Sequence, residues 1–105
     1  MSTDIPEGVE VQQVWLVEAQ YTPEATERRP PVRGEHLARV ARLRGEGTFI
    51  EAGAYIDALT SSVILLRADS EEEALAIARE DVYAKTGVWG EITARPFGRV
   101  VPAGT

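Results

Sequence analysis

The sequence predicts an α+β domain with the element order βαββαβ, and three observations lead to this fold class. Four segments show the apolar alternation or the short apolar runs typical of strands, at 9–21, 48–56, 62–68 and 88–100. Two segments repeat apolar residues at helical spacing, at 32–46 and from Ser70 to about Gly87. The 105 residues suffice for one domain. Split βαβ units in this order form a four-stranded antiparallel sheet with both helices on one face.

The strand segments differ in the burial that they predict. Val14-Trp15-Leu16-Val17 in the first and Val63-Ile64-Leu65-Leu66 in the third are apolar on both faces, which indicates strands that lie between two layers. Gly53 in the second predicts a β-bulge or a close backbone approach. The last strand alternates, so we expect Val88, Ile92 and Ala94 on one face and Trp89 and Phe97 on the other.

The first helix is predicted over 32–46. The preceding segment, 22–31, is polar and contains three prolines, which favours a loop and argues against a helix interior. Within the helix, we expect Arg39 and Arg42 to face solvent. The inward stripe follows i, i+4, i+7 spacing and consists of His36, Val40 and Leu43.

The second helix begins with a capping signal, because Ser70 is followed by Glu73 at the spacing of a capping box. The acidic first turn suits the helix dipole. Asp81 falls near the end of this helix and shares its inward face with Ala74, Ile77 and Ala78.

An open sheet face is expected opposite the helices. We predict that it carries Trp15, Val17, Phe49, Tyr55, Trp89 and Phe97, mixed with charged residues. An apolar face of this kind is normally covered. A second copy of the chain is the simplest cover, so we expect a homodimer through the open sheet face.

Composition narrows the function classes. The net charge is −6, with 17 acidic and 11 basic residues, so a nucleic-acid or anionic-membrane partner is not expected. The absence of Cys excludes disulfides and thiolate chemistry and suits a cytoplasmic protein. We expect one domain over 9–101, between flexible tails at 1–8 and 102–105, with no signal peptide and no membrane span.

His36, the only histidine, and Asp81 are the residues most suited to chemistry. Both are predicted on inward stripes of helices that cover the same sheet face, so they can meet. A carboxylate that holds one imidazole nitrogen fixes the tautomer and leaves the other nitrogen free as an acid or base. The alternative is a purely structural core histidine, with Asp81 capping a neighbouring turn. One histidine without an HExxH pattern or Cys predicts no metal site, and no glycine loop for phosphate is present.

Several short motifs between Val14 and Val100 resemble those of a known protein family. They are Arg33-x-x-His36-Leu37, Gly47 with Gly53, Glu73-Ala74, Asp81-x-Tyr83, Gly87-Val88-Trp89 and Arg95-Pro96-Phe97. In this order and spacing the sequence resembles the YciI-like family, whose domain is called YCII-related. The resemblance implies a ferredoxin-like fold that dimerises as an α/β barrel. It also implies that His36 and Asp81 match the family's suspected catalytic His and Asp, and that one branch resembles a dehydrochlorinase of a chlorinated hydroxyquinol.

The sequence departs from the family pattern at one position. The family usually has Asp-Pro where this chain has Asp81-Val82. Proline would end the helix at this point, whereas valine allows it to continue. We therefore expect a longer helix, in which Asp81 points differently.

The combined prediction is a cofactor-free enzyme of lyase or isomerase type. His36 would be the general acid or base and Asp81 would orient it. Arg33, one helical turn before His36, would contact an anionic group, and Tyr83 and Trp89 would line the cleft for a small, aromatic or quinone-like molecule. The alternatives are a non-catalytic ligand-binding or structural dimer, and a helper protein that docks on an enzyme partner.

Overall fold

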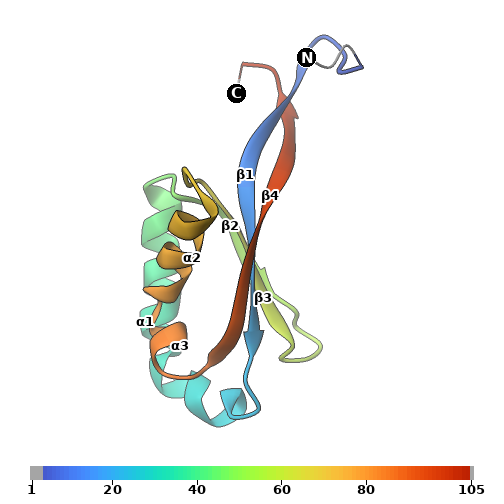
Figure 1. Ribbon diagram of the computed structural model, residues 1–105. Coiled ribbons are helices and arrows are strands. Elements are labelled where there is room, and N and C mark those ends of the chain that lie inside the picture. The colour runs from blue at the N-terminus through green and yellow to red at the C-terminus, as the bar shows by residue number, and fades with distance from the viewer. Residues whose placement is uncertain (1–3, 105) are drawn as a thin grey trace.

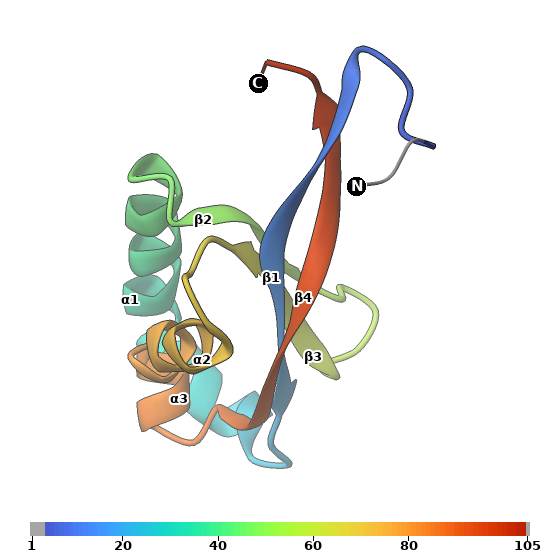
Figure 2. The ribbon, with the colours of Figure 1, turned by 45° about the horizontal axis from the view of Figure 1, so that its top comes forward.

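A computed structural model describes residues 4–104. Its four strands form one antiparallel sheet in the order β2-β3-β1-β4, and its helices all lie on one side of that sheet (Figures 1 and 2). The strands are β1 (Val9–Tyr21), β2 (Phe49–Ala54), β3 (Ser61–Leu66) and β4 (Trp89–Pro102). The helices are α1 (Ala25–Gly45), α2 (Glu71–Arg79) and α3 (Val82–Lys85). The predicted α+β class and antiparallel sheet are confirmed, and the strand order is that of a ferredoxin-like fold.

Helix α1 begins at Ala25, so the predicted loop over 22–31 is wrong. Pro30 and Pro31 lie inside the helix and cannot donate to the carbonyls of Thr26 and Glu27. Both of these residues are exposed, so water can bond the freed carbonyls. The helix tolerates its prolines because they fall on the solvent side of its first turns, while Ala25 is fully buried.

The predicted second helix is two helices, α2 and α3, which meet at Asp81. The backbone of Asp81 is extended, with φ −70° and ψ 144°, and its Oδ2 accepts the N–H of Tyr83 at 2.9 Å. This N-cap ends the continuous helix, so the expectation that Val82 lets it run on is wrong. The predicted start is confirmed, since Ser70 Oγ accepts the N–H of Glu73 at 3.1 Å.

Two β-bulges change the predicted side-chain alternation. One lies in β2 between Phe49 and Glu51, not at Gly53. The other lies at the start of β4, just after Trp89. Each adds one residue to its strand, so the residues before it change face relative to the rest. Phe49 and Trp89 therefore point into the core beneath the helices, and their prediction on the open face is wrong.

The central strand β1 was assigned the wrong face as well. Val17 is fully buried under the helices, and Trp15 shares its face and donates from Nε1 to the Ala68 carbonyl at 3.0 Å. Because β1 is apolar on both faces, its sequence carries no signal for which face meets the helices.

The open face is formed by the intervening residues of the central strands. Leu16 lies opposite Leu65, and both are half-buried. Phe97 is partly exposed, as predicted, while Tyr55 is exposed just beyond the end of β2. The open face therefore has an apolar centre with smaller side chains than the sequence predicted. It also carries charged residues, as predicted, since Arg95 lies opposite Leu16 and Glu18 lies opposite Val63.

Strands β1 and β4 continue past the rest of the sheet as a two-stranded ribbon (Figures 1 and 2). The pairing runs out to Val9 and Pro102, and the Ala103 N–H donates to the Gly8 carbonyl. None of the helices in the described part of the chain has the length and hydropathy needed to span a bilayer.

Candidate active site

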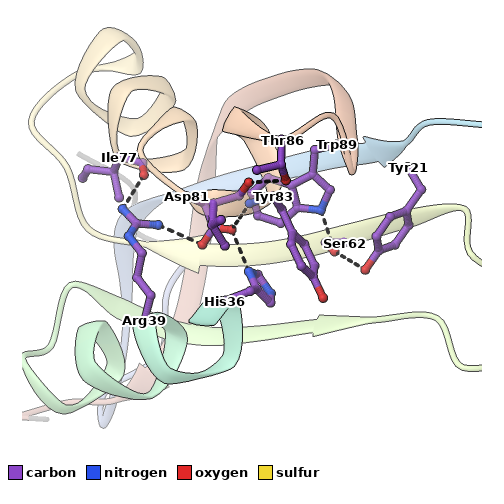
Figure 3. A network of polar contacts seen from close by, with 10 residues as sticks. Tyr21, His36, Arg39, Ser62, Ile77, Asp81, Tyr83, Thr86 and Trp89 are labelled. Atoms are coloured by element: carbon purple, nitrogen blue, oxygen red, sulfur yellow. Dashed lines mark hydrogen bonds and ion pairs between the residues drawn. The ribbon is translucent and has the colours of Figure 1, made fainter. Parts of the chain in front are cut away.

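His36 and Asp81 meet between α1 and the start of α3. The imidazole Nδ1 lies 2.7 Å from Asp81 Oδ2, although 45 positions separate the two residues in the sequence (Figure 3). Asp81 is only 1% exposed and His36 is also buried. An ionised carboxylate can only accept, so Nδ1 carries the proton of this bond and the neutral imidazole has its lone pair on Nε2.

Arg39 is the third member of this cluster, and the prediction that it faces solvent is wrong. Its Nη1 donates to Asp81 Oδ1 at 3.1 Å and its Nη2 donates to the Ile77 carbonyl at 2.7 Å (Figure 3). Its side chain is 17% exposed. The spacing from His36 is i, i+3, which places both on one side of α1 and could have indicated the shared partner. Arg42 is exposed, as predicted.

The Asp81 carboxylate is held in its ionised form. Burial acts to raise its pKa, but the hydrogen bond with His36, the backbone N–H of Tyr83 and Arg39 together lower that pKa below its ordinary value. The carboxylate is therefore a fixed negative charge near neutral pH, with both oxygens in use.

Aromatic rings hold the imidazole plane. The Tyr83 ring stacks on His36 with centroids 3.7 Å apart and an interplanar angle of 7°. Trp89 meets both rings edge-on, 5.4 Å from His36 and 5.5 Å from Tyr83. Its Nε1–H donates to Ser62 Oγ at 3.2 Å, and the Ser62 hydroxyl donates to Tyr21 Oη at 3.0 Å (Figure 3). The imidazole thus has little freedom to rotate away from Asp81.

A cleft of about 560 Å³ opens beside the imidazole. Of the predicted site residues, His36, Arg33 and Tyr83 line it, whereas Asp81 and Trp89 lie behind it. Among residues 4–104, no group bonds His36 Nε2, and this nitrogen is not sealed from solvent. Asp81 can therefore act on a ligand only through the residues that it contacts, His36 first among them. Trp89 can act only through its ring contacts and its hydrogen bond to Ser62.

Three further residues of the site escaped sequence analysis, namely Arg29, Tyr21 and Ser62. All of them line the cleft. Arg29 lies two helical turns before His36 on α1, but that part of the helix was assigned to a loop. Within the described range, no three His, Cys, Asp or Glu side chains converge on one point as metal ligands would. The chemistry that these residues can perform is proton transfer at Nε2 next to arginines.

The fold and this His–Asp pair define a small ferredoxin-like α+β protein with an imidazole at the edge of a cleft. The YCII-related domain matches residues 14–98, and the chain belongs to this family. Protein YciI of Escherichia coli is 31% identical over 96 residues, which cover 83% of this chain and 98% of the relative. An uncharacterized protein of Haemophilus influenzae is 30% identical over 95 residues, covering 82% and 97%.

A solved structure shares the fold. It is 5-chloro-2-hydroxyhydroquinone dehydrochlorinase (TftG) from Burkholderia phenoliruptrix, in complex with 2,5-dihydroxybenzoquinone. The TM-score is 0.68 at 17% sequence identity, and the match covers 80% of this chain and 92% of the other. At this identity the likeness establishes the architecture.

Proposed function

We propose that this protein is an enzyme of lyase or isomerase type that uses His36 as its acid or base and needs no cofactor. Asp81 orients the imidazole and Arg33 contacts an anionic group of the substrate. The substrate is a small aromatic or quinone-like molecule. The choice of this substrate class rests on analogy with a dehydrochlorinase of the same fold, and the contacts of the cleft carry the rest of the proposal.

The observation that carries the proposal is the 2.7 Å contact between His36 Nδ1 and Asp81 Oδ2 behind the cleft. It leaves Nε2, which is not sealed from solvent, as the free base of a residue that lines the cleft. Asp81 stays ionised and buried, so it stabilises the imidazolium that forms when Nε2 takes a proton. The stack of Tyr83 keeps the ring in place.

An elimination at this site needs only a proton transfer to His36 and a leaving group on the substrate. Nε2 accepts a proton from the substrate, and the electron pair left behind forms the new double bond. In a chlorinated hydroxyquinol, one hydroxyl proton first moves to the chlorine-bearing carbon, and that hydroxyl becomes a carbonyl. Nε2 then accepts the proton of a second hydroxyl, whose electron pair forms the other carbonyl as the ring double bond shifts. Chloride leaves with its bonding pair, so the elements of HCl are lost and a quinone remains. In an isomerisation, Nε2 returns the proton to another atom of the same molecule.

Turnover of 5-chloro-2-hydroxyhydroquinone tests this proposal, with chloride release as the readout. His36→Asn keeps an amide N–H near the position of Nδ1 and removes the base, so we expect turnover to fall at least 100-fold, in line with general base catalysis. Arg42→Gln is the control, because Arg42 is exposed and its side chain pairs with the exposed Glu46. Unchanged turnover in His36→Asn, or no chloride release by the wild-type protein, contradicts the corresponding part of the proposal.

A homodimer through the open sheet face is the second part of the proposal. Leu16 and Leu65 form an apolar pair on that face, next to the partly exposed Phe97. Burying such a face against a second copy adds core to a thin domain. Light scattering after gel filtration is expected to give a dimer for the wild-type protein and a monomer for Leu65→Glu. A monomeric wild-type protein contradicts this arrangement.

A non-catalytic ligand-binding dimer is the second candidate, and one observation favours it. Asp81 also caps α3 through the Tyr83 N–H, so the His36–Asp81 contact serves the fold as well. His36→Asn can lower the unfolding midpoint while the wild-type protein turns over no candidate substrate. In that case the non-catalytic, ligand-binding function replaces the enzymatic function.

A further inference from the structure

Two polar atoms are buried without a hydrogen-bond partner in the described part of the chain, and both belong to residues of the same cleft. They are Nε of Arg29 and the hydroxyl oxygen of Tyr83. Tyr83 is 1% exposed. Other polar groups packed around His36 are paired: Asp81, Arg39, Ser62 and the Trp89 indole all have partners.

Unpaired buried polar groups are costly and rare in folded proteins. A buried donor or acceptor that makes no hydrogen bond costs about 1–3 kcal/mol relative to one that is paired. Native structures keep only a few such groups, and a missing ligand is one of the ordinary explanations. Both atoms belong to residues that line one cleft, and the Arg29 side chain lies close enough to Tyr83 to act on the pKa of its phenol. This arrangement indicates a partner that enters the cleft beside both groups.

The charge of the cleft defines the partner. Arg29 and Arg33 both line it, with Asp57 as the one lining carboxylate among the described residues, although the chain as a whole carries a net charge of −6. The Arg29 guanidinium lies 5.8 Å from the centre of the Tyr21 ring, which holds it in place. Guanidinium groups can only donate and a phenol hydroxyl can donate to the same atom, so an acceptor with negative charge fits both.

Tyr83 is suited to donate. Burial raises the pKa of its phenol above the ordinary value, and the neighbouring Arg29 guanidinium offsets this only in part. The hydroxyl therefore stays protonated near neutral pH. A neutral phenol in a buried site donates a strong hydrogen bond to an anionic oxygen.

We propose that Arg29 and Tyr83 form a binding site for the anionic oxygen of a small ring-bearing ligand. The site deepens the function proposed above and rests on the same cleft. Because the Tyr83 ring stacks on the imidazole, an oxygen held by Tyr83 keeps the ligand within reach of His36. Arg29 and Tyr83 thus select ligands with an ionised oxygen and place them at the base.

Binding measured by calorimetry tests this site directly. The probes are 2,5-dihydroxybenzoquinone, whose hydroxyl groups are acidic, benzoate, which carries its charge on a carboxylate, and phenol as the neutral comparison. The variants are Tyr83→Phe, which keeps the stacked ring, and Arg29→Gln, with Arg42→Gln as the matched control for loss of one positive charge. We expect Tyr83→Phe and Arg29→Gln each to weaken binding of the preferred anion about 10- to 100-fold.

A second readout separates binding from folding. Tyr83→Phe removes a hydroxyl that has no partner in the free protein, so its unfolding midpoint is expected to equal or exceed that of the wild type. Tighter binding of the quinone or of benzoate tells which kind of anionic oxygen the site prefers. The proposal is overturned if neither anion binds the wild-type protein, if phenol binds as tightly as both, or if the two variants bind like Arg42→Gln.

The binding measurement does not depend on whether the protein turns over a substrate. His36→Asn is expected to retain anion binding while it loses turnover. If Tyr83→Phe binds normally and His36→Asn is inactive, the oxygen site is wrong and the acid–base function stands. If Tyr83→Phe loses binding and no turnover is found in any variant, the oxygen site stands without the enzymatic function.

Discussion

Replacing Asp81 by Asn removes the charge around which the site is organised. The carboxylate accepts three hydrogen bonds, from His36, Arg39 and the Tyr83 N–H, and it is 1% exposed. Asn keeps one acceptor oxygen for the Tyr83 N–H. Its amide group then points two donor hydrogens toward His36 or Arg39, both of which are themselves donors here.

The magnitude follows from these contacts. Breaking a buried ion pair by removing one partner costs about 3–5 kcal/mol. Arg39 keeps its bond to the Ile77 carbonyl and some contact with solvent, which reduces the loss. We expect Asp81→Asn to lower the free energy of unfolding by about 3 kcal/mol at pH 7, which is roughly a 2 M shift in urea midpoint for a domain of this size.

The pH dependence of the free energy of unfolding shows whether Asp81 stabilises the fold as an ionised group or by packing alone. The pKa of Asp81 is lowered in the folded protein, so its stabilisation is fully present above the unfolded pKa of about 3.9 and is lost as the pH falls through the folded pKa. Asn does not titrate. The difference in stability between wild type and Asp81→Asn should therefore shrink when urea unfolding is measured at pH 3 instead of pH 7.

The control is Asp57→Asn, since Asp57 is exposed in the loop after β2. Its effect is expected within about 0.5 kcal/mol at both pH values. A loss for Asp81→Asn that is below about 1 kcal/mol at pH 7, or that is equal at pH 7 and pH 3, would refute the view that an ionised Asp81 stabilises the fold.

Two further substitutions test the local backbone. Val82→Pro is expected to change the free energy of unfolding by less than about 1 kcal/mol. Val82 is the first residue of α3, and Asp81 before it already has the extended φ and ψ that precede proline. A loss above about 2 kcal/mol in chemical unfolding would contradict this expectation. Gly87→Ala is expected to cost about 1–2 kcal/mol, since Gly87 has φ +79° and an added Cβ would meet the Arg28 side chain. An unchanged thermal midpoint for Gly87→Ala would count against the strained turn.

Local signals located most elements but not their ends. The four strands and the Ser70 cap are located correctly because each signal depends on neighbouring residues, although the faces of three strands are not. The start of α1 was missed because the cost of Pro30 and Pro31 depends on whether the freed carbonyls reach solvent. Exposure of a carbonyl is a property of the packed helix and cannot be read from the dipeptide.

The break at Asp81 and the position of Arg39 were missed for a related reason. Helical periodicity places Asp81 inward but does not say that its carboxylate caps the Tyr83 N–H and opens the helix. Arg39 looks like a surface residue until a buried carboxylate from another helix meets it. Contacts between residues more than 40 positions apart depend on how α1 and α3 pack.

The sequence by itself determined the α+β class and the family, and it placed His36 and Asp81 on inward helix faces where they can meet, since these follow from periodicity and from short motifs. The tertiary structure alone decided which face of β1 is buried, that Arg39 joins the pair and that Trp89 lies behind the cleft. One extra residue in β2 and one in β4 moved Phe49 and Trp89 to the other side of the sheet. Such shifts are set by the pairing of strands distant in sequence, where a change of one residue in register exchanges the buried and the exposed face.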